Sequence, residues 1–159
     1  MSSFTTDQAS SDMNLYLRAE KEKADPEAWW RQPDTRLFAA GACHILAGVF
    51  CRTRPQPDFH PLLIHPGSDF RGTHVIVTDG SRAFDARGWT PLDNFLERYA
   101  QANRAVAPHW HYTVVSISDP LGWDFCLKYH HRHPTLFPHD PIPRARRFLE
   151  RVATAPDIV

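Results

Sequence analysis

The alternation of apolar and polar residues divides the chain into helical segments followed by strands. The most apolar stretch runs from Ala42 to Phe50 (ACHILAGVF), and its length and small residues favour a buried helix over a strand. Residues 73–78 (THVIVT) form a β-branched run that is typical of a strand. Asp79-Gly80 then provides a typical two-residue hairpin turn, so residues 81–86 are expected to return as the partner strand.

Further helices are predicted where a capping residue and a proline precede a mixed run. Asp25-Pro26 is expected to open a short helix through Trp29 and Trp30, and Thr90-Pro91 to open one from about Pro91 to Asn103. Three more helices are expected: one over 13–24, one that starts at Asp34 or Thr35 and ends at Gly41, and one over 144–153. Two more strands are expected, over 62–65 and 112–117. Helices first and then strands with one intervening helix indicate the α+β class, with N-terminal helices packed on a small antiparallel sheet.

Two segments carry more specific expectations. The C-terminal helix is expected to turn Phe148, Leu149 and Val152 inward, and to expose a basic face. That solvated face consists of Arg144, Arg146 and Arg147. Residues 119–141 are rich in aromatic residues and histidine but have little periodicity, so no element is predicted there.

Composition places the chain among soluble globular proteins. Its 159 residues are 42% hydrophobic and 23% charged, enough for one domain with a real core. Polar residues 1–12 are expected to be a disordered tail, and 13–159 a single domain. The 18 basic and 18 acidic residues cancel, so no nucleic-acid or membrane partner is expected. Without a signal-peptide pattern or a long apolar run a cytoplasmic location is expected, with signal-independent export left open.

The three cysteines point to a thiol rather than to a disulfide or structural zinc. Cys43, Cys51 and Cys126 are odd in number and form no CxxC pair. Cys51 and Cys126 are expected in the core. Cys43 opens the predicted buried helix, where the helix dipole and the free backbone N–H groups lower a thiol pKa and can form an oxyanion hole. Cys43 is therefore the candidate nucleophile.

The predicted hairpin adds a histidine and a carboxylate. If Asp79 and Gly80 are the two turn residues, His74 lies directly opposite Asp85, and the neighbouring pair Val75–Phe84 points to the other face. A carboxylate beside an imidazole orients the ring, fixes its tautomer and favours its protonated form. The sequence thus predicts a catalytic triad in the chain order Cys43, His74, Asp85.

These segments resemble a known superfamily. GACHILA at 41–47, THVIVTDG at 73–80 and FDARG at 84–88 resemble the papain-like and transglutaminase-like cysteine enzymes, over roughly residues 37–90. The resemblance implies Cys43 as nucleophile, His74 as general base and acid, and Asp85 as the residue that orients His74. It also implies hydrolysis or acyl transfer at a peptide, isopeptide or side-chain amide of a protein or peptide substrate, with no cofactor.

Some residues do not complete this pattern. No residue matches the superfamily's side-chain oxyanion donor, and Gln32 lies too far upstream of Cys43 to be assigned. Trp89, four residues after Asp85, is a candidate for a substrate-binding residue that lines a cleft. His44 directly follows Cys43, so on a helix it points about 100° away and is expected to pack or cap.

Two alternatives come from other functional classes. If Cys43 is a buried hydrophobe and His74–Asp85 a structural pair, the protein is a non-catalytic binding or regulatory protein on the same scaffold. The second alternative is a His-ligated metalloprotein, since imidazole suits several metals. Its ligands would come from His109, His111, His130, His131, His133 and His139, completed by Asp119, Asp124 or Asp140. The aromatic, proline-rich surroundings favour packed or solvated histidines instead, so no metal is expected.

Overall fold

An antiparallel sheet of five strands organises the fold of residues 14–152, the part of the chain that the computed structural model describes. The strands are β1 (His60–Pro66), β2 (His74–Thr78), β3 (Arg82–Asp85), β4 (Gly88–Pro91) and β5 (Tyr112–Ser116), in the spatial order β4-β3-β2-β1-β5. The α+β class is therefore confirmed. The predicted tail at 1–12 lies outside the described residues.

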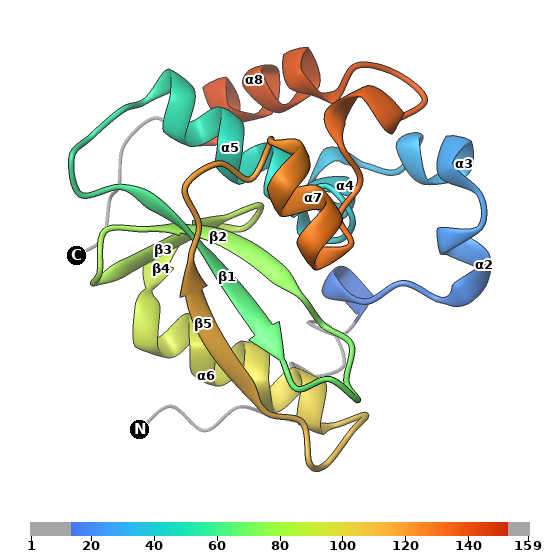
Figure 1. The fold of residues 1–159 in the computed structure, drawn as a ribbon, viewed down its shortest axis with the longest axis vertical. Coiled ribbons are helices and arrows are strands. Elements are labelled where there is room, and N and C mark those ends of the chain that lie inside the picture. Colours follow the sequence, from blue (N-terminus) through green and yellow to red (C-terminus); the bar gives the residue numbers. More distant parts are fainter. Residues whose placement is uncertain (1–13, 153–159) are drawn as a thin grey trace.

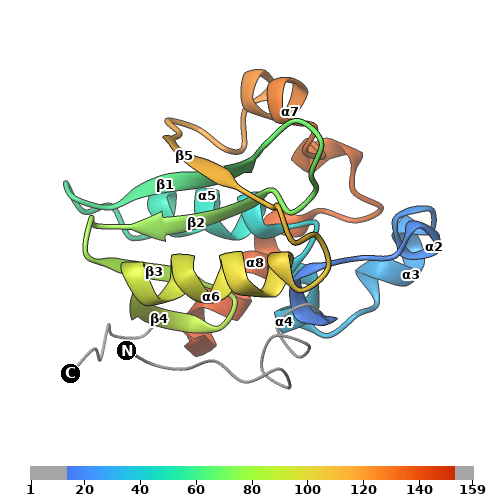
Figure 2. The same cartoon turned by 90° about the horizontal axis from the view of Figure 1, so that it is seen from below.

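Helices cover both faces of this sheet (Figures 1 and 2). The elements are α2 (Glu20–Lys23), α3 (Pro26–Trp30), α4 (Asp34–Ala39), α5 (Cys43–Thr53), α6 (Leu92–Arg104), α7 (Trp123–Tyr129), the 3-10 helix η1 (Pro134–Leu136) and α8 (Pro141–Val152). Helix α5 lies between the sheet and α8, whereas α6 lies on the opposite face of the sheet. None of the helices within 14–152 is long and apolar enough to cross a membrane.

Helix α5 is the buried helix that the apolar run predicts. Every residue from Cys43 to Phe50 is buried, because the helix packs on β2 with one side and on α8 with another. Phe50 meets Phe84 of β3 at 4.9 Å between ring centroids, which anchors the helix on the sheet. The helix runs three residues beyond the predicted end, to Thr53, whose hydroxyl donates to the carbonyl of Val49.

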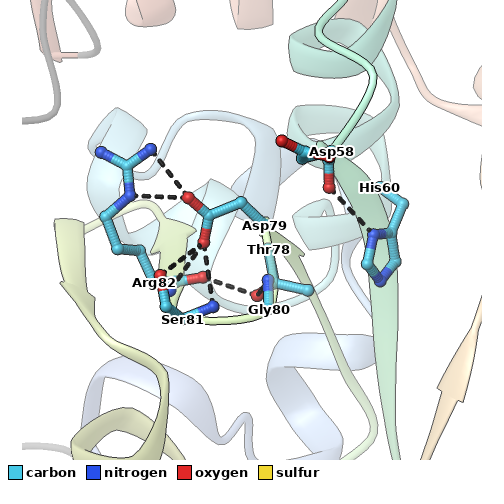
Figure 3. Close-up of polar contacts among 7 residues, drawn as sticks. All are labelled: Asp58, His60, Thr78, Asp79, Gly80, Ser81 and Arg82. Atoms are coloured by element: carbon cyan, nitrogen blue, oxygen red, sulfur yellow. Dashed lines mark hydrogen bonds and ion pairs between the residues drawn. The ribbon is translucent and has the colours of Figure 1, made fainter.

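The β2–β3 turn is longer than its Asp79-Gly80 signal predicts (Figure 3). Thr78 pairs with Ala83 and Val77 with Phe84, so four residues lie between the last paired residues and the predicted register is wrong by two residues. Asp79 forms this wider turn because its carboxylate accepts hydrogen bonds from the N–H groups of Ser81 at 3.0 Å and Arg82 at 2.8 Å. A shift of two residues keeps every side chain on its face of the sheet.

Other differences from the sequence expectations have local causes. Residues 13–24 do not form one helix: only 14–16 and α2 are helical among the described residues. Asp34 is not a cap but the first residue of α4, and its carboxylate binds Arg144 at 2.7 Å and Arg151 of α8. Arg144 is therefore mostly buried rather than solvated. Val152 is 37% exposed and not on the inner face.

Three elements have no sequence prediction, namely β4, α7 and the short 3-10 helix η1. Strand β4 pairs with β3 over four residues, including Pro91 opposite Arg82, and α6 begins one residue later at Leu92. The predicted cap at Thr90 is therefore a strand residue. Helix α7 arises within the segment 119–141, where Phe125 and Cys126 are buried against the core.

Candidate active site

Cys43 is the first residue of α5 and lies where the chain makes a tight approach to two side chains. Gly41 has φ +95°, a left-handed conformation that favours glycine. A Cβ atom at Gly41 would lie 3.0 Å from the Arg18 guanidinium carbon and 3.1 Å from Trp29 Nε1. Glycine therefore allows the chain to turn into α5, and the first N–H groups of this helix have no partner within it.

The Cys43 sulfur contacts the start of β2. Its Sγ accepts a hydrogen bond from the Val75 N–H at 3.4 Å. The β2–β3 pairing covers Val77 and Thr78 but not Val75, so this N–H is free to face the helix. Cys43 is only 3% exposed, yet it lines a cleft of about 720 Å³. The sulfur is thus held at the junction of helix and sheet and faces a space where a substrate can bind.

His74 and Asp85 lie together as expected, although not as a directly opposed pair. The His74 Nε2 and Asp85 Oδ2 are 3.2 Å apart, with both side chains almost completely buried. The pair forms despite the register shift because residues two positions off on neighbouring strands still share a face and are within reach of long side chains. Since Asp85 holds Nε2, Nδ1 is the ring nitrogen left to exchange a proton with Cys43.

The charges of Cys43 and His74 stabilise each other. Burial alone would raise the pKa of the Cys43 thiol, but the positive charge of His74 and polar contacts with His44 and His74 lower it to about 5. Burial likewise opposes protonation of His74, but the charge of Cys43 and the hydrogen bond to Asp85 raise its pKa to about 9. Between these two values Cys43 is a thiolate and His74 an imidazolium.

Tyr16 is a member of the site that the sequence analysis missed. Its hydroxyl donates to Asp85 Oδ2 at 2.6 Å, and its ring meets the His74 ring edge-on at 4.9 Å. Burial, followed by the charge of Asp85, raises the pKa of Tyr16, which keeps the hydroxyl protonated as a donor. The other Asp85 oxygen accepts from the Arg87 N–H at 3.0 Å. No motif signals Tyr16, because it precedes Cys43 in a segment without clear periodicity.

Removing the Tyr16 hydroxyl is expected to destabilise the fold. In Tyr16→Phe, the charged Asp85 loses one donor, and we expect the free energy of unfolding in urea to fall by about 1.5–3 kcal/mol. Tyr99→Phe is the matched control, because the Tyr99 hydroxyl donates to the neutral carbonyl of Gly72. That control is expected to lose about 0.5–1.5 kcal/mol. Equal losses in both variants would contradict a special interaction of Tyr16 with a charged Asp85.

His44 packs in the interior as expected, but its ring also lies close enough to Cys43 for a polar contact. It is fully buried, its Nε2 lies 2.6 Å from the carbonyl oxygen of Arg132, and its Nδ1 lies 3.3 Å from the Nδ1 of His131. Burial, then the nearby charge of His44, lowers the pKa of His131 to about 2, so this imidazole is neutral. The two histidines join the N-terminus of α5 to the segment that follows α7.

Within 14–152, one group combines enough ligand atoms for a metal ion, namely Cys43, His44 and His131. These atoms lie up to 4.8 Å apart, whereas ligands around a zinc ion lie about 3.5 Å apart. The three residues would have to move closer to hold an ion, so we assign no metal site to them.

The other histidines and acids of the alternative metal site form no ligand group among the described residues. His133 stacks on Trp123 at 3.7 Å, His139 contacts Trp30 at 5.4 Å and His111 meets Phe70 at 5.2 Å. Asp119 binds Arg52 at 3.3 Å rather than a histidine. These contacts agree with histidines that pack on aromatic rings or face solvent, as the sequence analysis favours.

Trp89 does not lie where the sequence analysis expects it. It is absent from the described residues that line the cleft, and its ring packs against Phe50 at 5.8 Å, Phe59 at 5.6 Å and Phe84 at 5.3 Å. Of the other cysteines, Cys126 is buried as expected, while Cys51 is only partly buried. Burial raises the pKa of Cys51 to about 11. Trp89 is thus a partly buried residue that packs against the core. Cys43 is the cysteine whose thiol has a lowered pKa.

Comparison with known proteins assigns no family to this chain. The interpretation of the site therefore depends on the arrangement of Cys43, His74 and Asp85. Searches of protein-family models, curated proteins and solved structures find no match to the chain.

Proposed function

We propose that the protein is a cysteine-dependent hydrolase or acyltransferase that acts on an amide bond of a peptide, an isopeptide or a side chain. The observation that carries this proposal is the buried arrangement in which Asp85 holds His74 and His74 lowers the pKa of Cys43. A purely structural pair of His74 and Asp85 gives no reason for a cysteine beside it at the N-terminus of a helix. A nucleophilic thiol explains this placement, because both the helix dipole and the imidazolium stabilise the thiolate.

The proposed reaction begins with attack of the Cys43 thiolate on the amide carbonyl carbon. The carbonyl oxygen becomes an oxyanion, which the N–H groups of Cys43 and His44 at the start of α5 can stabilise, since those of Ile45 and Leu46 already donate to the Ala42 carbonyl. The His74 imidazolium protonates the amine as its bond to carbon breaks, which leaves a thioester on Cys43. Neutral His74 then takes a proton from water or an amine as this nucleophile attacks the thioester, and the thiolate leaves.

The arrangement also supports a papain-like core. Cys43 opens a buried helix, and His74 and Asp85 come from neighbouring antiparallel strands that this helix packs against. The resemblance noted in the sequence implies the same placement and the same order along the chain. Cytoplasmic location and a protein or peptide substrate belong to this proposal as well.

Acyl transfer to Cys43 tests the proposal directly. Incubation with p-nitrophenyl acetate is expected to place one acetyl group on Cys43, read by peptide mass spectrometry before the thioester is hydrolysed. Cys43→Ser is expected to abolish this product, and Cys51→Ser to leave it unchanged because Cys51 keeps a high pKa. Acetylation shared among lysines and Cys51, with none on Cys43, would overturn the proposal in favour of a non-catalytic scaffold.

A further inference from the structure

The cleft beside Cys43 carries an excess of positive charge. Four basic side chains line it, Arg18, Lys23, Arg71 and Arg132, against a single acidic one, Asp69, among the described residues. Lys23 and Arg71 share one carboxylate, that of Glu20, which lies 3.8 Å from Lys23. The chain itself therefore neutralises only part of this charge, although its net charge is zero.

Arg18 is the basic side chain that the fold holds nearest to the start of α5. Its guanidinium lies against Gly41, two residues before Cys43, and over the ring of Trp29 at 5.2 Å. Arg18 forms no ion pair with a carboxylate inside the described range, in contrast to Arg36, which has Glu22 at 3.6 Å. Burial lowers the pKa of Arg18, and the nearby charge of Cys43 acts in the opposite direction.

Arg132 reaches the cleft from a distant part of the chain. Its backbone carbonyl oxygen lies 2.6 Å from His44 Nε2, which fixes this segment beside the N-terminus of α5. Its guanidinium lies over Phe137 at 5.7 Å and forms no ion pair within residues 14–152. Two arginines that form no ion pair within the described residues thus share the cleft with Cys43.

A cleft lined by arginines that form no ion pair with a described carboxylate suits one kind of ligand group. The planar guanidinium donates two parallel hydrogen bonds to a carboxylate or a phosphate, and such charged pairs are stronger than neutral hydrogen bonds. The rest of the wall is aromatic, with Trp29, Trp30, Phe70, Trp110, Tyr129 and Phe137. This wall suits an apolar or planar body behind a charged group.

We propose that the substrate carries an anionic group, a carboxylate or a phosphate, close to the carbonyl that Cys43 attacks, and that Arg18 and Arg132 bind this group. The inference rests on the proposed function, since it assigns the substrate class of the same site. Arg18 and Arg132 thus bind the substrate, whereas Cys43 and His74 perform the bond-breaking steps.

Two alkylating reagents of nearly equal size separate this claim from the reactivity of the thiol. Iodoacetamide is neutral and iodoacetate carries a carboxylate next to the carbon that the thiolate attacks with loss of iodide. We expect the ratio of the iodoacetate rate to the iodoacetamide rate to be about tenfold higher at Cys43 than at Cys51 in the same digest. The ratio is expected to fall with added salt, which screens charge.

Variants assign the effect to the two arginines. Arg18→Gln and Arg132→Gln are each expected to lower the rate ratio at Cys43 several-fold, since each removes one unit of positive charge from the cleft. Arg18→Lys keeps the charge and is expected to keep most of the ratio. Arg52→Gln is the matched control, because Arg52 is exposed at the far end of α5 and pairs with Asp119.

The two sources of the anion are distinguished by competition. Glutarate and inorganic phosphate are added while iodoacetamide labels Cys43, and the one that slows labelling at the lower concentration identifies the group. A rate ratio at Cys43 equal to that at Cys51, or no protection by either anion, would overturn the anion proposal. Iodoacetamide labelling at low pH would still show the activated thiol, so this failure is distinct from failure of the proposed function.

Discussion

In the His74→Ala variant, labelling of Cys43 by iodoacetamide at about pH 5.5 is expected to fall by about 10–100-fold. With His74 in place the pKa of the thiol is about 5, so most of Cys43 is thiolate at this pH. Without the imidazolium, burial again raises the pKa of the thiol, opposed only by the charge of His44 and its polar contact with the thiol, and the thiolate population at this pH falls. The more basic thiolate is intrinsically more reactive, which recovers part of this loss.

A second histidine on the same sheet provides the control. His60 opens β1 beside the hairpin turn, and it pairs with Thr78 at the opposite end of β2 from His74 (Figure 3). His60→Ala is expected to leave labelling of Cys43 unchanged. If His74→Ala unfolds the protein, His74→Gln keeps the size of the side chain and still lacks the charge. Unchanged labelling in a folded His74 variant would show that Cys43 and His74 do not form a pair.

Asp85→Ala is expected to lower the free energy of unfolding by about 3–5 kcal/mol, the usual effect of removing one partner of a buried ion pair. Asp85 is almost completely buried and binds His74, the Tyr16 hydroxyl and the Arg87 N–H. Its removal leaves a buried imidazolium and two donors without their acceptor. The measurement is the midpoint of urea unfolding, compared at equal slope.

The effect of Asp85 is expected to depend on pH. The pKa of His74 is raised to about 9 in the folded protein, above its ordinary value of about 6.5, so its stabilising charge is present below about pH 6.5 and is lost as the pH rises through about 9. The loss in Asp85→Asn should therefore shrink between about pH 6.5 and 10. Asp93→Ala, at an exposed position in α6, is expected to lose less than about 1 kcal/mol. Equal losses in the Asp85 and Asp93 variants would contradict a buried charged pair.

Much of the framework of the site can be predicted from local sequence. The apolar run from Ala42 to Phe50 favours a buried helix and forms one, and the β-branched run at 73–78 pairs with the strand after Asp79-Gly80. His74 and Asp85 meet although the turn has two more residues than its dipeptide predicts. The prediction tolerates this error because side chains alternate along a strand, so a shift of two residues preserves the face.

Long-range contacts account for what the sequence does not predict. Tyr16 meets Asp85 across 69 residues, and His44 meets His131 across 87. Neither contact leaves a pattern in the local alternation of apolar and polar residues. Trp89 is misassigned for the same reason: β4 is an unpredicted strand, and its pairing with β3 packs Trp89 on the core.

The amino-acid composition also does not predict the positive charge of the cleft. The balance of 18 basic and 18 acidic residues predicts no preference for an anion. The fold separates these charges, because Asp34 and Asp119 bind arginines that do not line the cleft. Arg18 and Arg132 remain without such a partner in the described part of the chain, which only their spatial arrangement reveals.

The measurement that tests the central claim most directly is the rate of Cys43 alkylation by iodoacetamide in the wild-type protein between about pH 4 and 10, read by peptide mass spectrometry. The shape of this profile reports the pKa of the thiol even though burial slows the reagent. We expect the rate at Cys43 to rise with an apparent pKa near 5, and the rate at Cys51 in the same digests to be still rising at pH 10, since the pKa of Cys51 is about 11. A profile at Cys43 that rises only near the ordinary thiol value of about 8.5 would contradict the thiolate–imidazolium pair.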